Sequence, residues 1–219
     1  MSSSLRFLVD HLPTFWQGLR ITLVLAFASY AGALILGALL AVMRISPAAP
    51  ARAAGLLYVE TFRNIPLLVL LFVAILCLPA IGLRINPFQS AFLVLVMYTA
   101  AQVCEALRSG VNSVARGQAE AGRALGLTFG QVLRFIVLPQ AFRTVVPPLG
   151  SIFIALVKNT AVASLIGVVE LTYMFGEMAR DFPARIVALL AGVAVFYLVI
   201  TIPASYVVSR FERRALIAR

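Results

Sequence analysis

The sequence predicts an all-α membrane protein: a single transmembrane domain over residues 1–219, with five spanning helices and a helical loop between the third and fourth spans. Composition is the first reason, because 62% of the 219 residues are hydrophobic and 12% are charged, whereas a soluble domain carries about 25% charged residues. The second reason is that charge-poor runs of about 20 residues, long enough to cross the hydrocarbon core as helices, recur along the chain. Together these features place the chain among membrane proteins.

The N-terminal segment is expected to form an amphipathic helix that leads into the first span. Asp10, His11 and Pro13 interrupt it, so it lacks the compact apolar core of a cleaved signal peptide. Phe7 and Trp16 are expected at the level of the lipid headgroups, where aromatic side chains gather.

Five long apolar segments account for the expected spans. Four contain no charged residue, and the fourth in chain order is interrupted by Lys158 alone. These runs cover 21–43, 64–83, 85–104, 144–169 and 186–209. The spanning helices are therefore predicted at about 16–44, 56–80, 86–110, 143–170 and 185–210.

Small residues recur at every fourth position along the first expected span. They are Ser29, Ala33, Gly37 and Ala41. This spacing lines one face of a helix and lets a second helix approach closely. The stripe indicates helix packing and carries no information about a substrate.

The arginines orient the five spans. Twelve of them fall on one side of the membrane: Arg44, Arg52, Arg63, Arg108, Arg116, Arg123, Arg134, Arg143, Arg210, Arg213, Arg214 and Arg219. Five fall on the other: Arg6, Arg20, Arg84, Arg180 and Arg185. Because basic residues accumulate on the cytoplasmic side, we expect the N-terminus outside and the C-terminus in the cytoplasm. The loop at 117–140 is then cytoplasmic.

That loop reads as two short helices joined by a sharp turn. Residues 118–125 favour a helix that Gly126 can end in a left-handed conformation. Thr128 and Gln131 have the spacing of a capping box for a second helix, which Pro139 is expected to end. The apolar side chains of this second helix share one face: Phe129, Val132, Leu133 and Ile136. The unit suits docking into a groove on a partner protein, and it equally suits a helix resting on anionic headgroups.

Three polar residues interrupt the expected fourth span. Lys158 lies roughly 22 Å along that helix, where a cation needs protein, water or a counter-charge around it. One interpretation is that Lys158, Asn159 and Thr160 line a translocation path for a polar or anionic solute. The alternatives are that Lys158 snorkels to the outer interface or pairs with Glu105 or Glu170.

Glu105 stands one helical turn before Arg108, at the expected cytoplasmic end of the third span. A structural ion pair between them is the first interpretation, and a gating contact with a neighbouring subunit is the second. Charged residues also gather in the outer loop, where a partner could dock or where they are simply solvated. They are Glu170, Glu177, Arg180, Asp181 and Arg185.

Several classes of function find no support in the sequence. Cys77 and Cys104 both lie in apolar runs, which is typical of buried hydrophobic residues, and the single histidine, His11, cannot form a histidine metal cluster. No aromatic and basic module for nucleic acid is present. A P-loop needs a lysine followed by Ser or Thr, but the one lysine, Lys158, precedes Asn159. The chain is therefore expected to bind no ATP and no cofactor itself, and if ATP drives its function another subunit binds the ATP.

The helical loop carries a motif that resembles the EAA loop of ABC importer permeases. That loop has the pattern E-A-A, three residues, G, nine residues, I-x-L-P. Here the pattern reads Glu120-Ala121-Gly122, Gly126, and Ile136-Val137-Leu138-Pro139. Gly122 replaces the usual third alanine and leaves the spacing unchanged.

Further segments resemble the polar amino acid branch of these permeases, the histidine, glutamine and glutamate type with a MetI-like type I transmembrane domain. They are Gly117-Gln118, the run Pro139 to Arg143, Glu60-Thr61-Phe62-Arg63-Asn64-Ile65-Pro66-Leu67, Glu105-Ala106-Leu107-Arg108-Ser109-Gly110 and Lys158-Asn159-Thr160. The likeness covers about residues 16–210, and at finer scale it is similar to the glutamate uptake permeases of actinobacteria.

The resemblance implies a multi-subunit importer in a bacterial cell membrane. Two permease subunits, identical or related, would form the pore, a dimer of ATPase subunits would bind ATP and Mg²⁺, and an extracytoplasmic binding protein would deliver the amino acid. The residues implied in coupling to the ATPase are Glu120, Ala121, Gly122, Gly126, Ile136, Leu138 and Pro139. Among these, Glu120 would contact the ATPase, Gly126 would shape the turn, and Leu138 with Pro139 would anchor the end of the loop against the spans.

A self-contained secondary carrier or channel is the alternative function, with Glu105 or Lys158 coupling ion and solute movement. Many carriers are built from repeated halves, and five spans without an evident internal repeat argue against this class. An enzyme within the membrane is disfavoured because no cluster of His, Asp or Cys lies in the spans.

Overall fold

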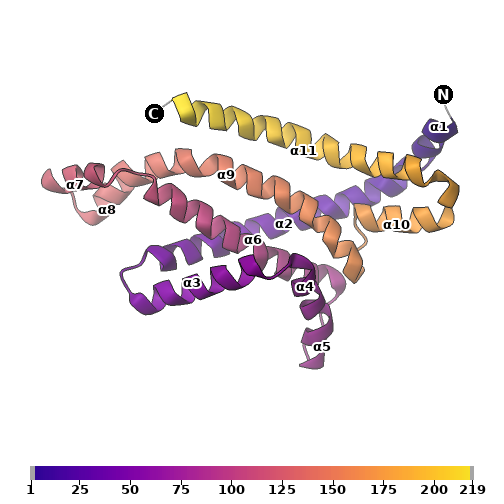
Figure 1. The fold of residues 1–219 in the computed structure, drawn as a ribbon, viewed down its shortest axis with the longest axis horizontal. Coiled ribbons are helices and arrows are strands. Elements are labelled where there is room, and N and C mark those ends of the chain that lie inside the picture. Colours follow the sequence, from indigo (N-terminus) through magenta and orange to yellow (C-terminus); the bar gives the residue numbers. More distant parts are fainter. Residues whose placement is uncertain (1–2, 218–219) are drawn as a thin grey trace.

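The computed structural model describes residues 3–217, and no strand occurs among them (Figure 1). The predicted all-α class is therefore confirmed. The longer helices are α1 (Ser3–Asp10), α2 (Leu12–Ile45), α3 (Ala49–Asn64), α6 (Pro87–Asn112), α7 (Arg116–Ala124), α9 (Leu138–Asn159), α10 (Leu171–Asp181) and α11 (Ile186–Ile217). The shorter elements are α4 (Leu67–Phe72), η1 (Val73–Cys77), α5 (Leu78–Ala80), α8 (Phe129–Val132), η2 (Leu133–Val137), η3 (Thr160–Ile166) and η4 (Pro183–Arg185).

Within the described residues, four helices are long and apolar enough to cross a membrane. They cover Leu12–Ile45, Pro87–Asn112, Phe129–Ile166 and Pro183–Arg213. Figure 1 shows α2, α6, α9 and α11 along the long axis of the molecule, with α7 and α8 at one end and α1 and α10 at the other. The loop with the motif and the aromatic N-terminal helix therefore lie at opposite ends of the bundle.

The second expected span is not one straight helix. Ala49–Asn64 and Leu67–Ala80 meet at an angle of 102° and together make a fifth candidate span. The break falls at Ile65 and Pro66, which are both extended, with ψ of 129° and 136°. Because proline disfavours a helical conformation in the preceding residue and has no N–H to donate, the helix ends there, and α4 and α5 project from the bundle (Figure 1).

The small residues of α2 allow a close contact with α6. Ser29, Ala33 and Ala41 are buried. A Cβ added to Gly37 would lie 2.6 Å from Val103 Cγ1 and 2.9 Å from the carbonyl oxygen of Ala100, so α6 packs directly on the backbone of α2. The predicted packing stripe is present and faces α6.

The helix that follows the loop does not end at Pro139, contrary to expectation. It continues through Pro139 as α9, because the wider π-turn η2 immediately precedes Leu138. A proline ring clashes with the carbonyl four residues earlier, and a π-turn moves that carbonyl away. The same arrangement recurs at η1, which precedes Leu78 and Pro79.

Cys104 is buried, as expected, but Cys77 is exposed and both thiols are free. Cys77 lies in the projecting segment after Pro66, where no other part of the chain covers it. The prediction took the apolar run around Cys77 as a sign of burial within this chain. Instead, the apolar side chains of this run are available to contact lipid or another subunit.

Candidate functional site

The helical loop (residues 116–140) is a compact hairpin of helices held by local backbone contacts. Gly126 has φ of +82°, and its N–H donates to the carbonyl of Arg123 at 2.9 Å. The N–H of Leu127 donates to the carbonyl of Gly122 at 3.2 Å. These two bonds make a Schellman turn, which needs a left-handed residue at the position of Gly126.

The predicted capping box at the start of the second helix is present. Gln131 N–H donates to Thr128 Oγ1 at 3.4 Å, and Thr128 N–H donates to Gln131 Oε1 at 2.8 Å. Gln140 Nε2 then donates to Gln118 Oε1 and joins the end of the hairpin to its beginning. The hairpin therefore has a defined shape before any partner binds it.

Gly122 is where the two helices of the hairpin touch. A Cβ at this position would lie 2.6 Å from Ile136 Cδ1 and 3.2 Å from Val132 Cγ2. Val132 is buried and Ile136 is half-buried, so the apolar face of the second helix turns partly inward onto α7. Because glycine replaces the usual alanine of the motif here, α7 can pack closely on the side chain of Ile136.

The outer side of the hairpin carries large apolar side chains with nothing over them. Leu125 is 84% exposed and Phe129 is 78% exposed. Glu120 and Ala121 are exposed on α7 beside them. Leu138 and Pro139 are also exposed, and their implied role in anchoring the end of the loop against the spans stays a prediction.

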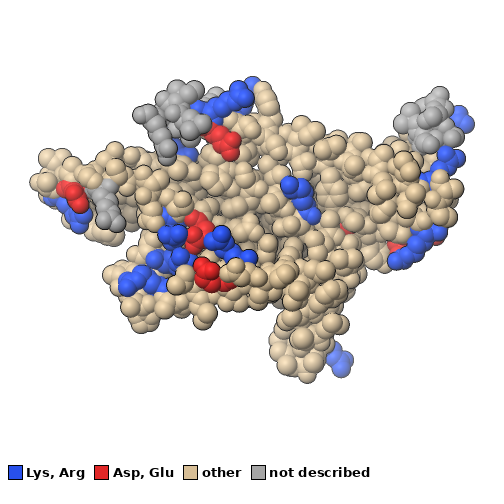
Figure 2. Space-filling model, viewed as in Figure 1, with Lys and Arg blue, Asp and Glu red and all other residues tan. Residues whose placement is uncertain are grey.

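Glu105 is surrounded by arginines from three helices. Arg108 Nη2 lies 2.9 Å from Glu105 Oε2, and Arg44 Nη1 on α2 lies 2.9 Å from Oε1. Arg63 Nη1 on α3 is 4.0 Å from Oε2. The Glu105–Arg108 pair expected from the spacing is present, but the two distant arginines could not be found from local sequence. Figure 2 shows the resulting group of charges over α3 and the adjoining ends of α2 and α6.

This cluster joins three helices through one carboxylate. The side chains of Arg44 and Glu105 are 13% and 22% exposed, whereas that of Arg63 is 49% exposed. A charge pair shielded from water interacts more strongly than an exposed one. The ion pair between Arg44 on α2 and Glu105 on α6 is therefore stronger than the pair between Arg63 on α3 and Glu105. Helix α3 is the one that ends at the break before Pro66.

Lys158, Asn159 and Thr160 do not share one environment. Thr160 is buried and its Oγ1 donates to the carbonyl of Val157 at 2.7 Å. Asn159 is half-buried and Lys158 is exposed. Among the described residues Lys158 forms no ion pair, so neither Glu105 nor Glu170 is its partner. Lys158 is thus open to a ligand or to another subunit.

Glu170 is not a solvated loop charge, contrary to one expectation. It is 0% exposed and caps α10, with Oε1 accepting from Tyr173 N–H at 2.8 Å. Oε2 accepts from Tyr197 Oη at 3.1 Å and from Thr22 Oγ1 at 3.3 Å. Burial raises the pKa of Glu170, although these hydrogen bonds and one from a backbone N–H nearby oppose the rise.

The exposed outer charges behave as the sequence indicated. Arg180 and Glu177 pair on the surface of α10, with exposed fractions of 77% and 46%. Val168 and Leu171 near Glu170 are buried, whereas Val169 is 43% exposed. The apolar residues on both sides of Glu170 were the available sequence signal that this glutamate differs from the others in the segment.

Comparison with known proteins places this geometry in a family. The family model described as "Binding-protein-dependent transport system inner membrane component" matches residues 33–217. The chain is 40% identical over 207 residues to the probable glutamine ABC transporter permease protein GlnM of Bacillus subtilis, covering 94% of this chain and 95% of the relative. It is 39% identical over 204 residues to the glutamate transport system permease protein GluC of Corynebacterium efficiens, covering 88% of each.

Solved structures agree with these relatives. The crystal structure of an amino acid ABC transporter with histidines superposes with a TM-score of 0.90 at 32% identity, covering 98% of this chain and 100% of that one. An inward-facing structure of the MetNI methionine ABC transporter gives a TM-score of 0.64 at 23% identity, covering 96% and 99%, and supports the fold alone.

Proposed function

Because the chain belongs to the family of binding-protein-dependent transport system inner membrane components, we propose that it is the permease subunit of an ATP-driven importer for a polar amino acid. The substrate is glutamate or a related acidic or neutral polar amino acid. One observation carries the ATP-driven part of the proposal: the hairpin at 116–140 is rigidly built but leaves Leu125 and Phe129 exposed, as a surface shaped for a partner would.

An ATPase dimer is the proposed partner for that surface, with each ATPase subunit receiving one hairpin. Leu125 and Phe129 would fill an apolar groove, and the neighbouring Glu120 would meet a polar rim. ATP and Mg²⁺ are bound by the ATPase, since this chain has no P-loop lysine. A second permease subunit, identical or related, completes the pore, and a binding protein delivers the amino acid. The N-terminus lies outside and the C-terminus in the cytoplasm.

Lys158 supports an acidic or polar substrate. It is an exposed cation within a long apolar helix, and a cation at membrane depth requires a polar environment or a counter-charge. We place Lys158 and Asn159 on the translocation path, with Thr160 shaping the backbone behind them. The neutral Asn159 adds no negative charge that would repel a carboxylate.

Reconstitution tests the proposal. The permease, with its cognate ATPase and binding protein, is placed in liposomes and the uptake of labelled glutamate and glutamine is measured with ATP inside. Uptake is expected only with ATP and the ATPase. Uptake by the permease alone would instead indicate a secondary carrier.

A pair of variants separates coupling from folding. Phe129→Asp removes the exposed apolar contact and is expected to lower ATPase binding and uptake at least tenfold, because truncating a central interface residue costs about 2 kcal/mol or more. Phe142→Asp is the matched control, since Phe142 is 70% exposed but lies beyond the hairpin. If Phe142→Asp lowered ATPase binding and uptake as much as Phe129→Asp does, the proposed docking surface would be contradicted.

A further inference from the structure

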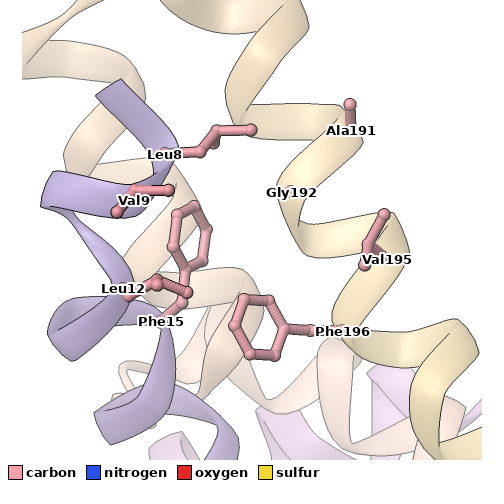
Figure 3. Close-up of a pocket in the computed structure, with 8 residues that line it drawn as sticks. All are labelled: Leu8, Val9, Leu12, Phe15, Ala191, Gly192, Val195 and Phe196. Atoms are coloured by element: carbon pink, nitrogen blue, oxygen red, sulfur yellow. The ribbon is translucent and has the colours of Figure 1, made fainter. Parts of the chain in front are cut away.

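A groove of about 300 Å³ lies between α11 and the N-terminal segment, which consists here of α1 and the first turn of α2 (Figure 3). Leu8, Leu12 and Phe15 line one side of it, and Ala191, Val195 and Phe196 line the other. Figure 3 shows Leu8, Phe15 and Phe196 directed into the gap between the two segments. Every lining side chain is aliphatic or aromatic, so the groove offers a water molecule no hydrogen-bond partner.

The groove is too narrow for a helix of another protein. Its two walls already meet at Gly192, where an added Cβ would lie 3.0 Å from Leu8 Cδ2 and 3.2 Å from Phe15 Cζ. The rings of Phe15 and Phe196 stack behind it, with centroids 5.4 Å apart. A helix with its side chains is about 10–12 Å wide, whereas a single hydrocarbon chain is slender enough to enter.

The depth of the groove matches that of a lipid acyl chain. Residues 191–196 follow Arg185 by 6 to 11 positions, which places them roughly 9–17 Å along α11. The hydrocarbon core is about 30 Å thick, and residues 186–209 contain no charge. Val187, Leu190 and Val195 are exposed on this helix, so the groove opens onto a surface that faces lipid.

The mouth of the groove carries groups suited to a headgroup. The Arg185 guanidinium carbon lies 5.9 Å from the centre of the Phe7 ring, and Phe7 directly precedes Leu8 in the wall. Phe7, His11 and Phe182 form an aromatic cluster with ring centroids 4.3–5.1 Å apart. Aromatic and arginine side chains gather at the membrane interface, and Arg185 precedes the groove residues on α11 by roughly one to three helical turns. A phosphate beside Arg185 would therefore leave its acyl chain at the depth of the groove.

We propose that this groove is a binding site for one phospholipid, whose acyl chain lies between α1 and α11 and whose phosphate lies by Arg185. The acyl chain adds contacts along the open part of the groove, beyond the points where the two walls already touch, and so strengthens the attachment of α1 to α11. This site differs from the general lipid coat because both helices and the stacked rings enclose the chain on several sides.

Two tryptophan variants test the acyl-chain site. Ala191→Trp fills the groove, while Ala194→Trp places the same side chain three residues later on α11, where Ala194 is exposed and outside the lining. Each full-length variant is washed in mild detergent, incubated with phosphatidylglycerol, and examined by native mass spectrometry. We expect wild type and Ala194→Trp to retain one phosphatidylglycerol, and Ala191→Trp to retain at least tenfold less. Equal retention by all three, or no retention by wild type, would overturn the site.

A second measurement covers the case in which Ala191→Trp does not fold. Wild-type protein in nanodiscs is labelled with phosphatidylglycerol that carries a photoactivatable acyl chain, and the labelled peptides are mapped. Enrichment on residues 7–16 and 186–196 supports the site, and even labelling of all spans contradicts it.

The phosphate contact is tested by two arginine variants in the same retention measurement. Arg185→Gln should lower lipid retention severalfold, while Arg180→Gln should leave it unchanged. The same retention in both would overturn the phosphate contact.

Discussion

Glu105 and Glu170 are two shielded glutamates at opposite ends of the bundle, and they are held in opposite ways. Glu105 faces three guanidinium groups, at 2.9, 2.9 and 4.0 Å. Glu170 accepts hydrogen bonds from a backbone N–H and two hydroxyl groups. The first carboxylate is stabilised by charge, whereas burial favours the neutral form of the second. The comparison shows that the partners of a shielded acid, more than its burial, decide what it contributes.

Each glutamate joins three helices, but the two joints serve different parts of the molecule. Glu105 links α2, α3 and α6 close to the helical loop, and Glu170 links α2, α10 and α11 close to the lipid groove. Charge pairs depend on ionic strength, while a network of hydroxyl and N–H donors depends mainly on geometry. Variants at Glu105 and at Glu170 should therefore differ in how much they lower the free energy of unfolding, and in how that loss changes with salt and pH.

The largest effect is expected for Glu105→Leu. Removing the carboxylate leaves three arginines facing one another in a partly shielded site, and breaking such a group by deleting one partner costs about 3 kcal/mol. For a chain of this size that corresponds to a fall in Tm of roughly 6–12 °C. Thermal unfolding of the purified chain in detergent measures it. A fall as small as that of an exposed glutamate variant would show that the cluster is not a stabilising joint.

Glu170→Ala should have the next largest effect, about 2 kcal/mol. It removes the cap of α10 and takes the carboxylate acceptor away from the hydroxyls of the buried Thr22 and the half-buried Tyr197. Glu170→Gln keeps the shape and one acceptor oxygen, and should cost within about 1 kcal/mol. Tm values of both variants at the same pH check this order, and the reverse order would contradict the hydrogen-bonded network.

The arginines around Glu105 should differ from each other. Arg44→Met is expected to cost about 2 kcal/mol, because Arg44 is well shielded and close to the carboxylate. Arg63→Met should cost under about 1 kcal/mol, since its side chain is half exposed and its pair is longer. Added salt should weaken the contribution of Arg63 more than that of Arg44. Unfolding at low and high salt tests both statements, and equal costs would remove the distinction.

The pH dependence of stability separates the two glutamates further. Burial raises the pKa of Glu170 above its unfolded value, which is about 4.3 for an ordinary glutamate. Protonated Glu170 therefore stabilises the folded state. This contribution is fully present at a pH below the pKa of Glu170 in the unfolded chain, and it is lost as the pH rises through the pKa of Glu170 in the folded protein. Compared with Glu170→Gln, wild type should lose Tm as pH rises from about 4 upward. A difference in Tm between the two that does not change with pH would show that folding leaves the pKa of Glu170 unshifted.

The smallest effect is expected for Glu177→Gln, which breaks the exposed pair with Arg180. Surface ion pairs contribute about 0–1 kcal/mol, so the change in Tm should lie within roughly 2–4 °C. This variant provides the baseline for the others. A loss comparable with that of Glu105→Leu would mean that exposure does not decide the strength of these pairs.

Features that depend on neighbours along the chain could be predicted. The Schellman turn at Gly126, the capping box of Thr128 and Gln131, and the Glu105–Arg108 pair all arise within five residues. The small residues of α2 also predicted their close contact, because a stripe at four-residue spacing has one possible use on a helix. The functional roles of the loop and of Lys158 stay predictions, to be tested by the reconstitution.

By itself, the sequence determined that the chain is helical and membrane-spanning, where the loop turns, and which family motifs it carries. These follow from apolar periodicity and from turn and cap residues, which act over one or two helical turns. Only the tertiary structure decided that Arg44 and Arg63 meet Glu105, that Glu170 is buried against Tyr197 and Thr22, and that α1 and α11 enclose a groove. The reason is physical: these contacts join residues up to 184 positions apart along the chain, as Leu8 and Gly192 are, and no local preference specifies which helix faces meet.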